Sequence, residues 1–517
     1  MDSDFDNLSM LSLLYPISYL LCLTGLVLWF YFKDNRSGSR MMSTLFLFSL
    51  LTYSFSLVAT DGSLSYKLLI LFRDMLIMAL VSQLFNYIRK SPIAVLIAGI
   101  AFYALIQFEG FNMLYNSFPE VQKSASPAND DFELLVETKD GTIPASYKHL
   151  IDKYSLTSER AFQPADPTLS ELDEFVLIGI PDQSENKTEE IIRELRRLSG
   201  TSFVEYNEVI NLEVLESDKS VALAAPKNVN DPMAVNQWGW DIIQGDRVHA
   251  MLGSGSIRPK KRALIAILDS GVDAVHEDLV NQFVSSGSTN DTDPLGHGTH
   301  CAGIAAAVSN NGLGITSLIP DASFVQVTSI KVMNAMGIGN QQAAIDGMIK
   351  AADMGADVIS MSLGGISSDS RQKAYEEAVK YCNAKGAIVI ASAGNSNQNA
   401  KGYAPANAKG IITVSAIGSD QRKASFSNTV DGMTYGIAAP GVKIMSTYPN
   451  QQYKEMDGTS MAAPMVAGLV GMLKAFRPEL TTKEVYDILS ETGKSIPDGK
   501  STGKMIQAAD ALEKVLD

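Results

Sequence analysis

Gly458-Thr-Ser-Met-Ala-Ala-Pro464 is the stretch on which the interpretation of this chain depends. It places the hydroxyl of Ser460 at the start of a run of small residues that favours a helix. Upstream, Lys261 to Asp269 (KRALIAILD) has the continuous apolar pattern of a parallel strand buried on both faces, and its last carboxylate lies where open α/β sheets place their sites. Gly296 to Gly303 (GHGTHCAG) puts His297 just before an alanine-rich helical run. The pattern predicts an α/β domain with an aspartate, a histidine and a serine in that order.

These three side chains have the chemistry of a nucleophilic hydrolase. A serine hydroxyl is a weak nucleophile at neutral pH, so acyl transfer needs a base to take its proton and a carboxylate to orient that base. Here Ser460 would be the nucleophile, His297 the base and Asp269 its partner. The tetrahedral intermediate also needs a hydrogen-bond donor, and the side-chain amide of Asn395, after the apolar run of residues 387–391, is the candidate.

Five ordered segments carry a resemblance to a known family. They are Asp269-Ser-Gly, His297-Gly-Thr-His, Ser362-Leu-Gly-Gly, Ala393-Gly-Asn and Gly458-Thr-Ser-Met-Ala-Ala-Pro. In order and spacing they resemble the subtilisin-like serine peptidases, the subtilases, from about Asn228 to the C-terminus. The resemblance implies a doubly wound parallel sheet and a serine endopeptidase that works through an acyl-enzyme. Asp269, His297 and Ser460 would be its triad, and Asn395 with the Ser460 N–H its oxyanion donors.

The same resemblance assigns the residues that hold the substrate. Val358 to Gly365 is similar to the strand that pairs with an extended peptide and presents the scissile carbonyl to the serine. The expected substrate-binding residues are Ser362, Leu363 and Gly364 on one wall of the primary specificity pocket, Ala391 to Gly394 on another, and Gly337 and Gly339 at the opposite edge of the cleft. Because these residues are small, a roomy groove without a sharp preference is expected.

No metal or cofactor is expected to be required. His297 and His300 would suit a zinc pair, but no further His or Cys cluster supplies a third and a fourth ligand. The loop Val308 to Ile315 is shorter than the calcium-binding loop of some subtilisins. Calcium there is therefore doubtful, and its binding stays open.

Two residues beside the triad modify the family pattern. Cys301 follows His300 directly, so we expect it to pack beneath His297 as a small buried side chain that makes the enzyme sensitive to mercurials. Met461 follows Ser460, and its oxidation would place a polar sulfoxide against the nucleophile.

The chain has three cysteines, Cys22 among them, which argues against a disulfide framework.

The first hundred residues have a different composition from the rest. Lys plus Arg and Asp plus Glu each count seven over residues 1–110, so the formal charge of −15 belongs to the residues after 110. Four apolar stretches approach the roughly 20 residues that span a bilayer: Met10 to Phe32, Met41 to Thr60, Leu68 to Ile88 and Ile93 to Phe108. Four transmembrane helices are predicted, and Arg73 with Asp74 is expected to form an interfacial pair rather than an intramembrane site.

The short loops give an orientation for these helices. The basic residues lie after the first span and after the third, as Lys33, Arg36, Arg40, Arg89 and Lys90. Placing them inside leaves everything after Glu109 on the non-cytoplasmic side, in the periplasm or outside the cell. An acidic soluble part argues against nucleic-acid binding, which needs basic patches.

Between membrane and peptidase we expect a small domain flanked by linkers. Its pattern predicts strand 132–138, helix 145–154, strand 157–162, strand 174–180, helix 188–198 and strand 203–214, which is the β-α-β-β-α-β order of a ferredoxin-like fold. In order and position it resembles the inhibitory propeptide of subtilases; an independent periplasmic domain is the alternative. As a propeptide it would inhibit the enzyme until self-cleavage, for which Val221 to Pro226 is the expected region.

The expected organisation has five parts: a transmembrane region (1–110), a linker (111–130), the prodomain (131–216), a second linker (217–232) and the peptidase (233–517). The expected partners are protein or peptide substrates, the membrane and the chain's own prodomain. Two other functions stay open at this stage. One is a pseudoprotease that binds peptides without cutting them, and the other is a membrane sensor or scaffold in which proteolysis only releases the helical bundle.

Overall fold

The computed structural model describes residues 18–59 with gaps at 20, 30, 33 and 34, single positions at 71, 74, 75, 78 and 81, and residues 132–517 except 213–214, 217–228, 254, 256 and 368–371. By its internal contacts the chain divides into two compact units, Met1–Ala125 and Ser126–Asp517. The division falls inside the linker predicted over residues 111–130.

The N-terminal unit is helical wherever it is described at length. Its longest element is α2 (Arg36–Ala59), and residues 21–29 form a preceding helical stretch. Asp74, predicted to form an interfacial pair with Arg73, is fully buried, and its Oδ2 accepts a hydrogen bond from the Tyr53 hydroxyl at 3.1 Å; Arg73 lies outside the described residues, so the pair stays a prediction. The predicted fourth span, 93–108, lies outside the described residues.

One helix of the described part of the chain is long and apolar enough to cross a bilayer. It is α14 (Thr459–Phe476), and all of its residues are buried inside the second unit. This helix is therefore the core helix of that unit.

The second unit is organised around a six-stranded parallel sheet. Its strand order is β15-β14-β12-β10-β7-β8, in which every neighbouring pair is parallel. The strands are β7 (Ala263–Asp269), β8 (Val325–Lys331), β10 (Val358–Met361), β12 (Ile388–Ser392), β14 (Ile412–Ile417) and β15 (Gly436–Pro440). The run 261–269 thus forms an interior strand, as its apolar pattern predicts.

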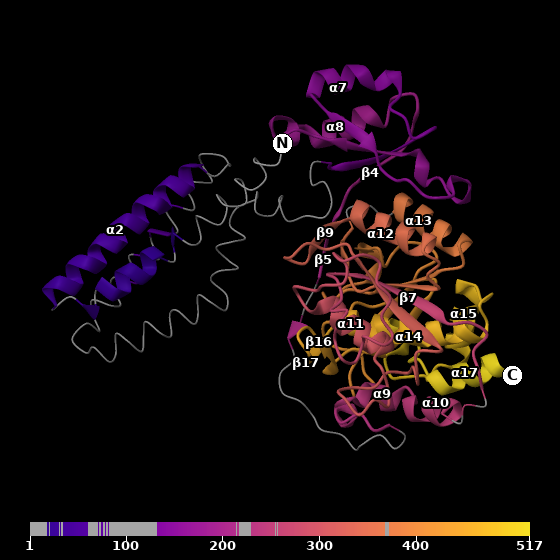
Figure 1. The fold of residues 1–517 in the computed structure, drawn as a ribbon. Coiled ribbons are helices and arrows are strands. Elements are labelled where there is room, and N and C mark those ends of the chain that lie inside the picture. The colour runs from indigo at the N-terminus through magenta and orange to yellow at the C-terminus, as the bar shows by residue number, and fades with distance from the viewer. Residues whose placement is uncertain are drawn as a thin grey trace. The chain divides into compact units, whose positions relative to one another are not determined.

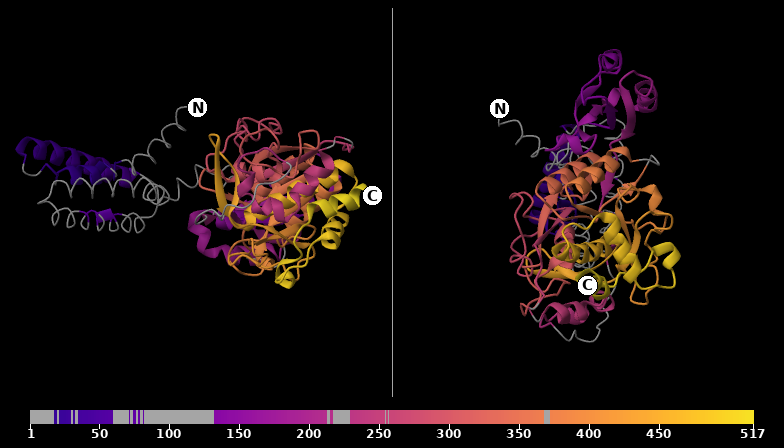
Figure 2. Two further views of the ribbon diagram at one scale, coloured as in Figure 1. Left: turned by 90° about the horizontal axis from the view of Figure 1, so that it is seen from below. Right: turned by 90° about the vertical axis from the view of Figure 1, so that its right-hand side faces the viewer.

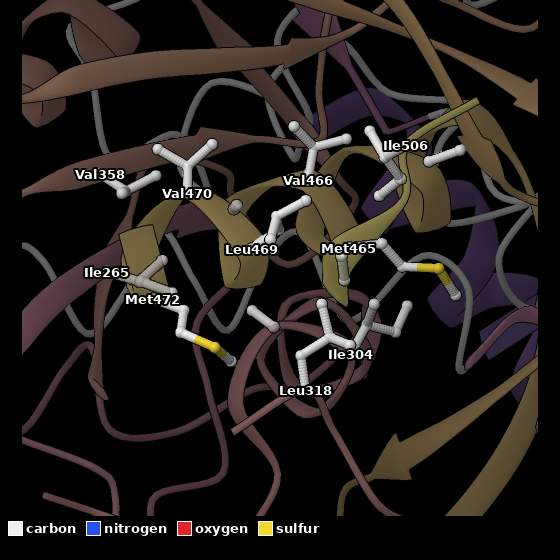
Figure 3. Close-up of a cluster of buried hydrophobic side chains, with 14 of the residues drawn as sticks. Ile265, Ile304, Leu318, Val358, Met465, Val466, Leu469, Val470, Met472 and Ile506 are labelled. Carbon is white, nitrogen blue, oxygen red and sulfur yellow. The ribbon is translucent and has the colours of Figure 1, made fainter. Parts of the chain in front are cut away.

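Helices cover both faces of this sheet, which explains why its strands are apolar on both sides. Ile265 and Ile267 of β7 belong to the cluster that includes α14 and α11 (His297–Ala306), whereas Ala266 and Leu268 belong to the cluster with the helices of the other face. Those helices are α12 (Gln341–Asp353) and α13 (Lys373–Ala384). Figure 3 shows Val470 of α14 beside Val358 of the sheet and Met472 beside Ile265.

Shorter elements complete this domain. The helices are α9 (Trp238–Ile242), α10 (Gly245–Leu252), α15 (Thr482–Thr492), α16 (Gly499–Thr502) and α17 (Ala508–Leu516), and the strands are β9 (Ile338–Asn340), β11 (Gly365–Ile366), β13 (Tyr403–Ala404), β16 (Ile444–Tyr448) and β17 (Gln452–Asp457). β11 pairs with β13, and β16 pairs with β17.

A small α+β domain precedes the large one. It contains β1 (Leu134–Thr138), α7 (Lys148–Tyr154), β2 (Thr157–Arg160), β3 (Phe175–Gly179), α8 (Thr188–Leu195) and β4 (Thr201–Tyr206). Its antiparallel sheet has the order β2-β3-β1-β4, the arrangement of a ferredoxin-like fold. The domain, purple in Figures 1 and 2, lies against α12 and α13 of the large domain.

The last predicted strand of the small domain, 203–214, is not continuous. β4 ends at Tyr206, and the next residues leave the sheet so that the Asn207 side chain accepts from the backbone N–H of Gln342 at the start of α12. The chain then forms β5 (Val209–Asn211), which pairs with β9, and β6 (Leu215–Glu216), which pairs with β17. The period-2 pattern could not reveal this change of partner.

Candidate active site

The three predicted residues of the triad lie at the ends of three elements. Asp269 ends β7, His297 begins α11, and Ser460 is the second residue of α14. Glycines permit this approach: a Cβ on Gly298 would lie 2.0 Å from the carbonyl oxygen of Gly271, and Gly458 has a φ of 150°. A side chain at Gly298 would clash, and at Gly458 it would be strained by the backbone angle. The close approach of these elements therefore requires glycine at these positions of the motifs.

Asp269 and His297 form a buried pair. His297 Nδ1 lies 2.9 Å from both carboxylate oxygens of Asp269, and each side chain is 1% exposed. Burial is the largest single effect and lowers the pKa of His297, but the adjacent Asp269 carboxylate and Cys301 together raise it by more, so the pKa lies well above its usual value. The imidazole is thus oriented with Nδ1 toward the carboxylate and Nε2 toward the opposite side.

Two residues that the sequence analysis missed hold this pair in place. Ser270 donates to Asp269 Oδ1 through its backbone N–H (2.7 Å), and its hydroxyl donates to Asp293 Oδ1 (2.8 Å) while lying 3.1 Å from Asp269 Oδ1. Asp293 accepts from the N–H groups of Gly296 (2.9 Å) and Thr299 (2.8 Å), at the start of α11. An aspartate four residues before His297 is typical of a helix N-terminus, and this is the signal that could have revealed it.

Ser460 and Asn395 face the same cleft. The Ser460 hydroxyl donates to the carbonyl oxygen of Ser362 at 3.2 Å, and His297 Nε2 has no hydrogen-bond partner among the described residues. Asn395 Oδ1 accepts from the N–H (2.9 Å) and the hydroxyl (2.8 Å) of Thr459. Because its oxygen is held by these two donors, the amide is fixed with Nδ2 directed away from Thr459.

A pocket beside Ser460 contains most of the predicted substrate-binding residues. Its lining includes Asn211, Ser362, Leu363, Gly364, Ser392, Gly394, Asn395, Tyr403, Ala404 and Ser460. Ala391, the neighbour of Ser392 on β12, is fully buried and packs into the core instead, because successive residues of a strand point to opposite faces. Tyr403 was not predicted to be here; the pairing of β13 with β11 brings it to the pocket.

Gly337 and Gly339, predicted at the opposite edge of the cleft, are not among the residues that line this pocket. Gly337 and Gly339 flank the start of β9, and the Gly337 carbonyl accepts from the N–H of Leu212 at 2.9 Å. Asn211 lies across from Gly364, with N–H to oxygen distances of 2.9 and 3.3 Å in the two directions. The segment after the small domain therefore lies between the two edges.

Cys301 packs against the histidine as expected from its position. It is fully buried, its Sγ lies 3.9 Å from His297 Nδ1, and burial raises the pKa of the thiol. The ligand atoms of Asp269, His297 and Cys301 lie within 4.8 Å of one another. His300 is not part of this group, since its Nε2 contacts the Lys454 carbonyl oxygen at 2.9 Å.

The loop Val308–Ile315 is held by two buried carboxylates, Asp231 and Asp278. The Asp231 oxygens accept from the N–H groups of Asn310 and Asn311, and the Asp278 oxygens accept from the Asn311 side chain and the Ile315 N–H. All four oxygens thus have donors within the protein. The expectation that calcium is not required stays a prediction.

Cys301 connects the carboxylate–imidazole pair to the serine, since its Sγ lies 3.9 Å from His297 Nδ1 and 3.4 Å from the Ser460 carbonyl oxygen. A parallel α/β sheet that brings such a pair close to a helix-start serine has the architecture of a serine hydrolase. A sequence model described as the subtilase family matches residues 260–506. Thermitase from Thermoactinomyces vulgaris is 41% identical over 253 residues, covering 48% of this chain and 80% of thermitase. Subtilisin DY from Bacillus licheniformis is 38% identical over 275 residues, covering 52% of this chain and 94% of that protein. The chain belongs to the subtilase family, and it is a serine endopeptidase that acts on proteins or peptides.

A solved structure also resembles this chain. It is described as proteases from Pseudoalteromonas arctica PAMC 21717, is 28% identical, covers 56% of this chain and 100% of its own, and has a TM-score of 0.49.

Proposed function

We propose that this chain is a membrane-anchored serine endopeptidase that uses Asp269, His297, Ser460 and Asn395 and that cleaves its own prodomain. The observation that carries the catalytic part is the Asp269–His297 pair, because it fixes the imidazole with Nε2 as the remaining proton acceptor. In the proposed reaction the Ser460 hydroxyl turns from the Ser362 carbonyl toward Nε2 and gives up its proton, and Oγ bonds to the substrate carbonyl carbon.

The later steps follow from the same groups. Asn395 Nδ2 donates to the oxygen that becomes negative in the tetrahedral intermediate. The C–N bond breaks as His297 passes its proton to the departing amine, and the acyl group stays on Ser460. A water molecule then gives its proton to His297 and attacks the ester, which releases the acid and restores the serine.

Residues 209–212 and 215–216 support self-cleavage, because both stretches pair with strands of the large domain that lie near Ser460 in the sequence or in the fold. On one side of Ser460, Asn211 pairs with Gly364 and Leu212 with Gly337; on the other, Leu215 pairs with Asp457 of β17. Ile210 is fully buried on the first side, where it packs with Leu363 and Met333. Backbone pairing and one buried side chain are what strand addition uses to bind a peptide.

The register also indicates which bond would be cut. If a bound peptide continued the antiparallel pairing of Asn211 with Gly364, its residue two positions further on would lie opposite Ser362. The Ser362 carbonyl accepts from the Ser460 hydroxyl, so the carbonyl at that position of a substrate would lie nearest the nucleophile. Counted from Asn211, we therefore propose cleavage between Glu213 and Val214, upstream of the predicted region 221–226; both stretches lie outside the described residues.

Contacts between the two domains support an inhibitory role for the small one. Glu205 of β4 is 2% exposed and accepts from the N–H groups of Lys373 (2.9 Å) and Ala374 (3.1 Å) and from the Gln341 side chain (2.8 Å). A carboxylate at a helix N-terminus interacts favourably with the exposed N–H groups and the helix dipole. These contacts of the small domain with α12 and α13 support the proposal that it inhibits the enzyme until it is cleaved off.

Processing can be tested with the full chain. Wild-type protein should lose mass and yield a mature N-terminus at Val214, whereas Ser460→Ala should remain intact. A matched variant, Ser446→Ala, removes another buried serine hydroxyl of the same domain and should still be processed. Identical processing in Ser460→Ala would show that another protease cuts the chain, and labelling by a fluorophosphonate would still report separately on Ser460 as the nucleophile.

The exposure of α2 supports the membrane part of the proposal. Met41, Leu47, Phe48 and Leu51 of this helix are 57–69% exposed, and its buried polar side chains include Ser49. A helix that turns large apolar side chains outward and polar ones inward suits a lipid environment rather than water. This favours the predicted anchor and a peptidase on the non-cytoplasmic side.

Alkaline carbonate extraction of membranes tests the anchor. Ser460→Ala protein, which should not separate from its N-terminus, is expected to stay with the membrane pellet. The same variant lacking residues 1–110 should appear in the supernatant. Full-length Ser460→Ala in the supernatant would contradict the anchor and leave the peptidase assignment untouched.

A further inference from the structure

The loop before β7 carries the densest basic run of the chain, Arg258-Pro-Lys-Lys-Arg262. Four of these five residues are basic, in a chain whose 57 acidic residues outnumber its 42 lysines and arginines. All four basic residues are exposed. We call this run the basic edge, because it lies at the edge of the sheet where β7 begins.

The fold uses the backbone of the basic edge and one of its side chains. The N–H groups of Lys260 (2.9 Å) and Lys261 (3.1 Å) donate to the carbonyl oxygen of Ala475, near the end of α14. Lys261 Nζ also lies 2.5 Å from Asp357 Oδ1. Within the part of the chain that the structure describes, the other three basic side chains take part in no hydrogen bond or ion pair: Arg258, Lys260 and Arg262. Packing and capping therefore do not explain these three charges.

The neighbouring acidic residues do not neutralise the basic edge. Asp357 is already paired with Lys261. The two adjoining loops, before β8 and after α14, contribute Asp321 and Glu479, and the second loop also contributes Arg477. Positive charge is therefore in excess at this edge, although the whole chain carries a formal charge of −15.

The basic edge and the catalytic cleft lie at opposite ends of one strand. β7 begins at Ala263, directly after the basic edge, and ends at Asp269 of the triad. A strand of this length spans roughly 20 Å. Glu455 and Asp457, which shortly precede Ser460, place negative charge at the cleft end. A surface that bound the basic edge would thus leave the cleft facing solution.

We propose that the basic edge docks the mature peptidase on a membrane surface that contains anionic phospholipids. Their phosphate groups supply the negative charge and the acceptor oxygens that arginine and lysine side chains bind. A cluster of about four basic side chains is sufficient for such recognition. The inference rests on the proposed function, because self-cleavage would separate the peptidase from its anchor. Docking would then keep the released enzyme at the membrane with its cleft open to substrates.

The test measures vesicle binding of Ser460→Ala protein without residues 1–110. This protein keeps the whole second compact unit and cannot cut itself, so its binding depends neither on the anchor nor on processing. Its partition coefficient on vesicles of phosphatidylcholine with phosphatidylglycerol should exceed that on pure phosphatidylcholine by about tenfold or more. Raising the NaCl concentration from about 0.05 to about 0.5 M should release it, because salt screens exposed charges.

Two triple variants of this protein locate the binding surface. Arg258→Gln, Lys260→Gln and Arg262→Gln together should lower the partition coefficient about a hundredfold, which is about fivefold for each side chain. The matched control removes three exposed lysines outside the basic edge and its adjoining loops, as Lys401→Gln, Lys494→Gln and Lys500→Gln. This control should change the partition coefficient by less than about twofold, because distant charges are screened. Both variants should keep Tm within about 2 °C of the parent protein, which shows that they fold.

The outcomes separate this inference from its alternatives. Equal binding of the parent protein to both kinds of vesicle, or an equal loss in the two triple variants, would overturn it. Displacement by inorganic phosphate at constant ionic strength would show a site for a free anion instead. Binding to double-stranded DNA as tightly as to the anionic vesicles would show a general polyanion surface, and that would also overturn lipid docking.

The proposed function is measured by other experiments, so the two can fail separately. Labelling of Ser460 and the mature N-terminus report on the peptidase and its processing, and carbonate extraction reports on the anchor. None of these depends on the three side chains of the basic edge that the first triple variant removes.

Discussion

Asp293 offers a sharp test of how the site is held together, because it lies outside every motif and contacts no substrate. Asp293 is 8% exposed, and its carboxylate accepts five hydrogen bonds. The donors are the N–H groups of Leu295, Gly296 and Thr299 and the hydroxyls of Thr299 and Ser270. Asp293→Ala would leave these donors without an acceptor at the start of α11, the helix that carries His297.

The size of the effect follows from these contacts. The N-cap of α11 is Gly296, but Asp293 accepts from the Thr299 N–H as a capping side chain would, and loss of such an acceptor costs about 1 kcal/mol. A buried donor left without a partner costs about 1–3 kcal/mol. If water reaches all but one of the donors, the free energy of unfolding should fall by about 3 kcal/mol. For a domain of this size each kcal/mol lowers Tm by about 2–4 °C, so we expect a fall of about 6–12 °C. A displaced His297 should also lower kcat by about 10- to 100-fold with little change in KM.

Thermal unfolding is best measured in the Ser460→Ala background, which removes self-digestion, and kcat in the active protein. Asp291→Ala is the matched control, since its side chain, in the same loop, accepts only from the Ser285 hydroxyl among the described residues. This control should lower Tm by no more than about 2 °C. If Asp293→Ala resembles Asp291→Ala in both Tm and kcat, the reasoning that Asp293 positions the histidine helix is refuted.

Three further predictions concern the groups around Ser460. Because Asp269 raises the pKa of His297, and the base must be neutral to act, the acid limb of kcat/KM should have its midpoint above about 6.5 and move downward in Asp269→Asn; a wild-type midpoint at or below that value would contradict the coupling. Mercurials should inhibit the wild-type enzyme and Cys382→Ser but spare Cys301→Ser, because only Cys301 has its sulfur within 3.9 Å of His297 Nδ1; inhibition of Cys301→Ser would place the reactive group elsewhere. Peroxide should inactivate the wild type and spare Met461→Ala, since the sulfoxide would stand beside the nucleophile, and full activity of protein shown by mass to carry oxidised Met461 would disprove this.

The parts of this structure that the sequence predicts are those encoded by local pattern. The apolar run that ends at Asp269 must be buried on both sides, so its strand and the position of its carboxylate follow directly. The glycines around His297 and Ser460 are required by close approach and by unusual backbone angles, and such requirements are visible as motifs.

Residues brought to the site by long-range pairing have no such local signature. Tyr403 reaches the pocket only because Gly365 pairs with Ala404, and nothing in the sequence near Tyr403 indicates that partner. The break after Tyr206 is similar, since the period-2 pattern continues while the backbone changes from one sheet to another. The side-chain environment of Asp74 was missed for the same reason, because its tyrosine partner is distant in sequence.

The position of the proposed cleavage is set by the fold of the small domain rather than by the linker after it. Asn207 holds the start of α12, and Ile210 and Asn211 then fix the next residues by burial and by pairing with Gly364. A slip of one residue would turn Ile210 out of the core and exchange the groups that face each edge, so the register has little freedom. The bond presented to Ser460 therefore depends on the distance along the chain from Ile210 and Asn211. Sequence changes in 221–226 should leave that bond unchanged, whereas inserting one residue directly after Asn211 should move it.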